Sequence, residues 1–150
     1  MTYGSETSST IMLDVVMFER PLFSGPVTRL CARTSLGELA ILPRHAALMG
    51  LLLPGVVRIH EPGKTRPLLL YVGGGFLEVQ PAHVTVLAEG GLWPHEVRID
   101  EMRELREDAA RRMKSSVLFQ DRDQAQIEWM QANAQIELWE RANEDRGNAG

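Results

Sequence analysis

The chain has 150 residues and an ordinary apolar fraction of 44%, which suits one compact domain with an appendage and excludes a disordered chain. Its net charge of −4 gives no sign of a nucleic-acid partner. The longest apolar run, residues 46–57, is interrupted by glycine and proline and is too short to cross a bilayer, so we expect a soluble protein without direct membrane insertion.

The first part of the chain has the pattern of an all-β domain. Residues 1–10 are polar, lack the apolar core of a signal peptide, and are expected to form a flexible tail. Over residues 11–92, short apolar runs alternate with glycine and proline, and their spacing favours a sandwich or a barrel. Seven strands are predicted, at residues 11–18, 27–34, 37–42, 56–61, 67–72, 76–80 and 83–89, with a hairpin turn at 61–64.

Three consecutive glycines, Gly73 to Gly75, stand in the run LLLYVGGGFLEV at residues 68–79. A phosphate-binding loop requires a helix after its glycines, so that the helix N-terminus meets the anion. Here the glycines are followed by another strand-like run. The sequence therefore predicts a close backbone approach or a bulge within a sheet.

The second part of the chain has the period of helices. After a linker at residues 93–98, helix-forming residues fill 99–114, and their apolar positions Ile99, Met102, Leu105, Ala109 and Met113 follow one helix face. A second helix is predicted at 121–145, with Ala125, Trp129, Ala132, Ile136 and Trp139 on one face. We expect an antiparallel helical hairpin over residues 99–146, and a disordered end at 147–150.

The residues that carry chemistry give little support for an active site. The four histidines, His45, His60, His83 and His95, are widely spaced and do not suggest a zinc site. The single cysteine, Cys31, lies in an apolar stretch and is expected to be buried and inert. The residues by themselves indicate a binding or structural module, with no catalytic group and no metal.

Six stretches, taken in order, resemble one known family. They are LDVV (13–16), LFSGPV (22–27), GELAILPRHAAL (37–48), LLPGVVRI (52–59), YVGGGFLEVQPAHVTVLAE (71–89) and IDEMR (99–103). Together they are similar to the epsilon subunit of the bacterial F-type ATP synthase. The resemblance implies an N-terminal ten-stranded β-sandwich followed by a C-terminal antiparallel two-helix hairpin.

The resemblance also implies a function. It indicates a non-catalytic subunit of the rotating central stalk, which binds the gamma subunit and the c-subunit ring and couples ion flow to ATP synthesis. An extended form of the two helices would enter the alpha/beta catalytic hexamer and block ATP hydrolysis. The implied location is peripheral, on the cytoplasmic face of the bacterial inner membrane. The coupling ion, H⁺ or Na⁺, is set by other subunits.

Individual residues take roles from the same resemblance. Glu38 and His45 match the residues that face the c-ring, and Arg44 stands between them where the family has glycine. Asp100 and Arg103 match a motif with which some members bind ATP. Glu104 replaces the small alanine of that motif, and its carboxylate would repel a phosphate, so Asp100 is also interpreted as a first-turn helix residue. No cofactor is expected otherwise.

The inhibitory arm is expected to use basic and aromatic side chains of the hairpin: Arg106, Arg111, Arg112, Lys114, Trp129 and Trp139. Residues 121–146 carry seven acids and three arginines. An acidic segment of the beta subunit would repel this excess of negative charge. We therefore expect weaker inhibition than in basic relatives, or anchoring by the tryptophans. Two alternatives stay open: an ATP-sensing inhibitor, and a free-standing β-sandwich adaptor whose helices dimerise.

Overall fold

The computed structural model describes residues 10–18 and 20–147, so most of the expected N-terminal tail and residues 148–150 lie outside the described part. Ten strands come first: β1 (Ile11–Met17), β2 (Arg20–Val27), β3 (Arg29–Thr34), β4 (Gly37–Ile41), β5 (Leu48–Leu52), β6 (Gly55–His60), β7 (Leu68–Val72), β8 (Gly75–Val79), β9 (His83–Ala88) and β10 (Gly91–Leu92). A short 3₁₀ turn, η2 (Pro94–Glu96), leads to the helices α1 (Ile99–Ser115) and α2 (Phe119–Gly147).

The ten strands form a β-sandwich that folds out of one continuous sheet. Along the sheet the order is β10-β7-β6-β3-β5-β8-β9-β1-β2, and β4 pairs with the free side of β3. Strands β3 and β5 meet only at Thr34 and Leu52, so this corner separates two layers of five strands. The layers enclose one apolar core, which includes Leu13, Leu30, Ile59 and Leu77. The ten-stranded sandwich with two C-terminal helices is confirmed.

The structure contains all seven strands predicted from the local pattern, and three more. Strand β2 was missed because Pro21 and Pro26 lie within it. It is the last strand of the sheet and pairs only with β1, and an edge strand tolerates residues that cannot donate a hydrogen bond. Strand β5 has Gly50 at its centre, and β10 has only two residues. These three strands depend on pairing with distant segments more than on their own sequence.

The glycine triplet forms the crossing from β7 to β8 between the two layers. Its backbone pairs with the segment after β9, since the Gly73 amide donates to Gly90 and the Glu89 amide donates to Gly74. Gly74 and Gly75 have φ angles of 117° and 137°, which favour glycine. A Cβ on Gly75 would overlap the carbonyl oxygen of Leu87 and lie 3.2 Å from the Cα of Ala88. The close neighbour of the glycines is therefore strand β9.

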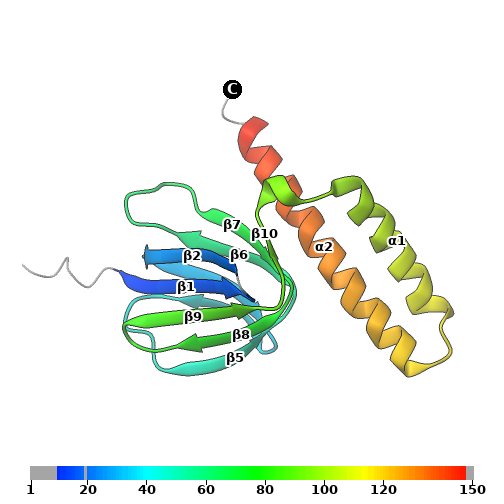
Figure 1. The fold of residues 1–150 in the computed structure, drawn as a ribbon, viewed down its shortest axis with the longest axis horizontal. Helices are drawn as coiled ribbons and strands as arrows, with labels where there is room; N and C mark the ends of the chain where they lie inside the picture. The colour runs from blue at the N-terminus through cyan, green and yellow to red at the C-terminus, as the bar shows by residue number, and fades with distance from the viewer. Residues whose placement is uncertain (1–9, 19, 148–150) are drawn as a thin grey trace, which may run out of the picture.

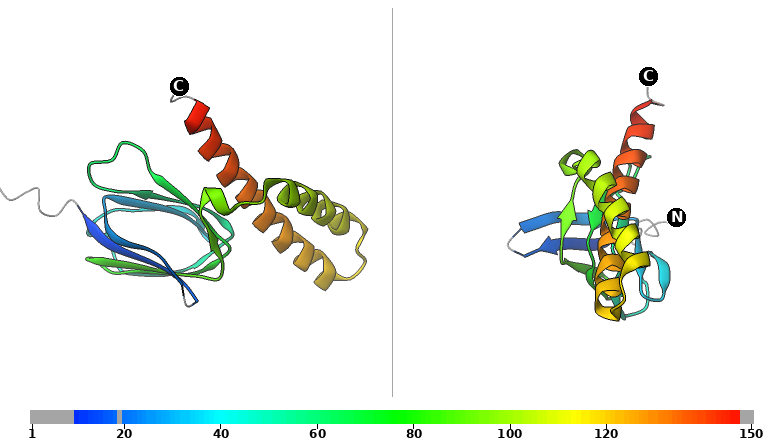
Figure 2. Two further views of the ribbon diagram at one scale, coloured as in Figure 1. Left: turned by 45° about the horizontal axis from the view of Figure 1, so that its top comes forward. Right: turned by 90° about the vertical axis from the view of Figure 1, so that its right-hand side faces the viewer.

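The two helices form an antiparallel hairpin, and α2 lies between α1 and the sandwich (Figure 1). Figure 2 shows the same arrangement from two further directions. Residues 116–118 alone separate the helices, so each helix is slightly longer than predicted. Ala109 of α1 and Ala125, Ala132 and Ile136 of α2 are buried, so small residues let the helices approach closely.

A second apolar face of α2 attaches the hairpin to the sandwich. Ala134 and Leu138 are buried against Tyr71 of β7, with Val56 and Leu69 at the border. Burial raises the pKa of the Tyr71 hydroxyl, and a hydrogen bond with Gln135 of α2 opposes that shift. The sequence pattern showed one apolar stripe on α2, whereas the folded helix has one face for α1 and another for the sheet.

Candidate interaction surfaces

The outer face of the layer formed by β1, β5, β8 and β9 carries a row of apolar side chains. Pairing places Leu51 beside Phe76, Phe76 beside Leu87, and Leu87 beside Val16. Directly paired side chains of neighbouring strands are in contact range, so these four residues form one band, which we call the apolar row. Between 36% and 54% of the surface of each is exposed. Solvated sheet faces are normally polar, and this row across the face is not.

A shallow hollow of about 430 Å³ lies along one side of the apolar row. Its lining includes Val16, Phe76 and Leu87 from the apolar row, together with Phe18 and Glu89. Phe18 follows β1 and is 86% exposed. An exposed aromatic ring beside an apolar hollow is a feature of protein interaction sites.

A polar row runs beside the apolar row on the same face. It includes Glu78, Thr85 and Asp14 on neighbouring strands. The Ser24 hydroxyl donates to one oxygen of Asp14 at 2.6 Å, and Nε2 of His83 lies 2.8 Å from the other. Both oxygens of Asp14 are thus engaged within the protein, while Glu78 accepts a hydrogen bond from Gln80 at 3.0 Å.

The residues expected to face the c-ring lie at two ends of β4. Glu38 is near the start of this strand, and Arg44 and His45 follow its end, so the structure does not bring Glu38 and His45 together. Arg44 has a φ of 66°, the backbone conformation that glycine adopts without cost. The Arg44 amide donates to the carbonyl of Pro81. The arginine therefore keeps a glycine-like turn in this loop.

Glu38 also faces the hairpin. Its carboxylate accepts a bond from Arg58 of β6 at 3.2 Å. Both side chains line a polar cavity of about 90 Å³ together with Glu137 and Arg141 of α2. Glu137 and Arg141 form their own ion pair at 2.8 Å. Any change at Glu38 is thus expected to affect the packing of α2 on the sandwich.

Most of the residues assigned to an inhibitory arm make contacts inside the hairpin. Arg112 of α1 binds Glu128 of α2 and lies 2.8 Å from Asp108. The hydrogen bond from Arg112 lowers the pKa of the Glu128 carboxyl. Arg106 donates to Asn133 at 3.0 Å. Among the others, Arg111 lies 3.7 Å from Asp108, Lys114 is exposed, and Trp129 and Trp139 are partly buried.

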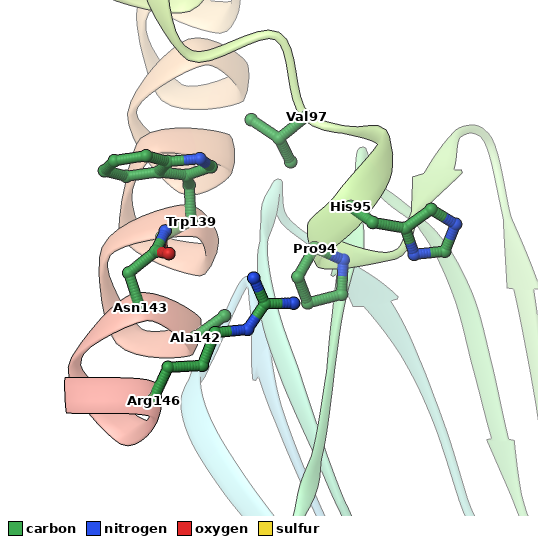
Figure 3. Close-up of a pocket in the computed structure, with 7 residues that line it drawn as sticks. All are labelled: Pro94, His95, Val97, Trp139, Ala142, Asn143 and Arg146. Carbon is green, nitrogen blue, oxygen red and sulfur yellow. The ribbon is translucent and has the colours of Figure 1, made fainter. Parts of the chain in front are cut away.

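The ATP-binding candidates are not arranged around a common cavity. The side chain of Asp100 is 97% exposed and lies 3.9 Å from Arg103. The Arg103 guanidinium lies 5.4 Å from the centre of the Trp139 ring, a cation–π contact. Trp139 also lines a pocket of about 270 Å³ between α2 and the segment 94–97 (Figure 3). That volume is below the range usual for small-molecule sites.

The pocket in Figure 3 is bounded by the linker on one side and the last turns of α2 on the other. Arg146 extends toward Pro94, whereas the His95 ring points away from α2. The linker itself is fixed by Glu96, which accepts from the Trp93 amide at 3.0 Å and from Arg20 at 3.1 Å. The Trp93 hydrogen bond is the main cause of the lowered pKa of Glu96.

Two further findings concern other kinds of site. Within residues 10–18 and 20–147, no three histidine, cysteine or acidic side chains are grouped as metal ligands would be. No helix in this part of the chain is both long and apolar enough to span a membrane. Cys31 is buried, as predicted.

Sequence reasoning missed the apolar row and the packing of Tyr71 against Ala134 and Leu138 of α2. Both had a signal in the strands themselves. Segments such as GFLEV and HVTVLA place apolar residues at successive positions, and successive residues of a strand point to opposite faces. Apolar side chains on both faces of a strand indicate that both faces are covered, one by the core and the other by a helix or a partner.

Comparison with known proteins supplies a relationship for this fold. A family model described as ATP synthase, Delta/Epsilon chain, beta-sandwich domain, matches residues 10–94. The ATP synthase epsilon chain of Nitrosococcus oceani is 38% identical over 144 residues, 92% of this chain and 98% of that one. The ATP synthase epsilon chain of Neisseria meningitidis serogroup C (strain 053442) is 38% identical over 115 residues, 77% of this chain and 79% of that one.

The fold also matches a solved assembly. A chain in the structure of the Euglena gracilis mitochondrial ATP synthase, described as OSCP/F1/c-ring in rotational state 1, aligns with a TM-score of 0.75 and 22% identity. The alignment covers 94% of the present chain and 86% of the other. At that identity the match concerns the fold, and it includes the hairpin as well as the sandwich.

Proposed function

This chain belongs to the ATP synthase epsilon chain family, and on that premise we propose that it is a non-catalytic subunit of the rotating central stalk. In this role it binds the gamma subunit and the c-ring, and it couples ion flow to ATP synthesis. It lies peripherally on the cytoplasmic face of the bacterial inner membrane. The family relationship and the exposed apolar face of the sandwich support this proposal.

The apolar row is the observation that carries the proposal. Four apolar side chains from four strands, with Phe18 beside them, form a face that a free-standing domain would leave in contact with water. Burying a Leu or Phe side chain fully contributes about 1.5–3 kcal/mol, and the row is about half exposed. We assign this face to the gamma subunit, which would cover it permanently in the assembled complex.

Reconstitution tests the assignment. The full-length chain is added to a catalytic complex that lacks this subunit, and binding is measured for Phe76→Ser, Leu87→Ser and a control, Val117→Ser. Val117 is 88% exposed in the turn between α1 and α2, outside the sandwich. We expect a loss of about 10-fold or more for each row variant and little change for the control. Equal binding by all four proteins would reject the assignment.

The c-ring contact is proposed for the loops around β4. Arg44 and His45 lie in the loop after this strand and are open to a partner, and Glu38 is exposed at its start. Because Glu38 also binds Arg58 beside α2, the test uses His45→Ala and Arg44→Gly. ATP-driven ion pumping is measured for complexes that contain one variant or the other. Unchanged pumping in both complexes would reject the ring contact.

The regulatory role of the hairpin is proposed as a weak inhibitory arm. Extension would break the contacts of Arg106 with Asn133, Arg112 with Glu128, and Arg103 with Trp139. It would also present an acid-rich α2 to the catalytic hexamer. The test is ATP hydrolysis by the assembled complex after truncation at Pro94. A large rise in activity would refute weak inhibition.

ATP sensing is the second candidate function. The pocket beside Trp139 and the contact of the Arg103 guanidinium with the Trp139 ring are the observations in its favour. Its small volume and the exposure of Asp100 oppose a tightly enclosed nucleotide. Calorimetry of the full chain with Mg-ATP separates the candidates: binding that is lost in Arg103→Ala would support ATP sensing, and no heat would reject it.

A further inference from the structure

The charged residues around the apolar row are acidic. On β1, β5, β8 and β9, all of whose residues the structure describes, the outward charged or titratable side chains are Asp14, Glu78 and His83. Glu89 follows β9 and lines the hollow along the other side of the row. The face thus has an apolar band with a carboxylate at either border, and neither lysine nor arginine points outward from these four strands.

The two border acids differ from Asp14 in what they can offer a partner. Asp14 has one oxygen bound to Ser24 and the other beside His83. Glu78 accepts one bond, from Gln80, and is exposed. Glu89 is exposed at the rim of the hollow. Carboxylates of this kind bind lysine or arginine at the rim of an interface, where they affect association rate and partner choice.

We infer, on the basis of the central-stalk role proposed above, that the gamma-subunit surface seated on this face is an apolar ridge with basic side chains along both of its borders. One basic group meets Glu78 in the polar row. A second basic group meets Glu89 at the border of the hollow. The hollow itself receives a large apolar side chain from the gamma ridge, which packs next to Phe18. The acids at opposite borders fix the position of the partner along the strand direction.

The same charges disfavour a second copy of this chain as the occupant. Two such faces brought together would place border carboxylates of both copies within one interface that lacks outward lysine or arginine. Carboxylates of the two copies within one interface repel each other. The apolar row therefore stays available for a basic partner. The free-standing dimeric adaptor would lack this electrostatic match if it used this face.

The test compares association kinetics of full-length variants with the catalytic complex that lacks this subunit. The double variant Glu78→Gln and Glu89→Gln removes two border charges. The control, Glu61→Gln and Glu140→Gln, makes the same change in net charge on the turn after β6 and on α2. At low salt we expect the border variant to associate about 3- to 10-fold more slowly, with a weaker dependence on salt, and the control to match the unmodified chain.

The outcomes separate the two levels of the proposal. Unchanged association of the border variant, or equal slowing in the control, would overturn the basic ridge while leaving the central-stalk role in place. Failure of the unmodified chain to bind the catalytic complex would overturn both. Sedimentation of the chain alone adds a second reading: we expect a monomer at micromolar concentration, and dimers that involve the apolar row would also contradict the inference.

Discussion

Replacing Gly75 with alanine is expected to destabilise the sandwich strongly. At a φ of 137°, a non-glycine residue costs about 1–3 kcal/mol. The added Cβ would also overlap the Leu87 carbonyl oxygen and lie 3.0 Å from its carbon. Those are backbone atoms of β9, so they cannot move aside as a flexible side chain would, and overpacking adds about 1–3 kcal/mol. The expected loss is about 2–6 kcal/mol.

Two other glycines supply graded controls for this prediction. Gly74 has a φ of 117°, but a Cβ there would meet its nearest neighbours at 3.4 Å, so Gly74→Ala should show the backbone cost alone, about 1–3 kcal/mol. At Gly50 a Cβ meets nothing within 4 Å, and Gly50→Ala should change stability by about 0.5 kcal/mol or less. The assay is urea unfolding followed by circular dichroism.

The result that would refute this reasoning is a Gly75→Ala protein within about 1 kcal/mol of Gly50→Ala. Since Gly75 pairs with Ala88 directly beside the pairing of Phe76 with Leu87, a surviving variant should also disturb the apolar row. A protein that is destabilised by the expected amount and still binds the catalytic complex normally would show that the row tolerates movement of β8 against β9.

Three other predictions concern the hairpin and the core. Glu128→Gln should destabilise α1 against α2 by about 1 kcal/mol at neutral pH. This difference should shrink on acidification, because Arg112 lowers the pKa of Glu128 and the bond is lost as the carboxyl takes up its proton. Hydrogen exchange of α1 amides measures it, and Glu140→Gln, on the exposed side of α2, is the control for the change in net charge. Leu138→Ala should weaken docking of α2 on Tyr71 by about 2–4 kcal/mol, seen as faster exchange in the helices while the strands stay protected; equal loss of protection in the strands would contradict separate stabilities. Cys31, 2% exposed, should react slowly with a thiol reagent in the native protein and rapidly in urea, and rapid native reaction would show that the β3 region opens.

The sequence by itself determined the elements whose pattern is local. The helices predicted at 99–114 and 121–145 follow from residues three and four positions apart, and the seven predicted strands follow from short apolar runs between turn residues. The close backbone approach predicted for the glycine triplet is confirmed at Gly75, whereas Gly73 and Gly74 form the connection between β7 and β8. The resemblance to a family added the ten-stranded sandwich.

Only the tertiary structure decided which faces these elements present and to what. Leu51, Phe76, Leu87 and Val16 are far apart in the chain, and strand pairing alone brings them into one row. Glu38 likewise lines the polar cavity beside Glu137 and Arg141 of α2 because the fold brings these distant segments together. Strand β2, with its two prolines, is stable because it lies at a sheet edge. Local periodicity is set within a few residues, whereas register and burial depend on contacts between segments that the sequence separates.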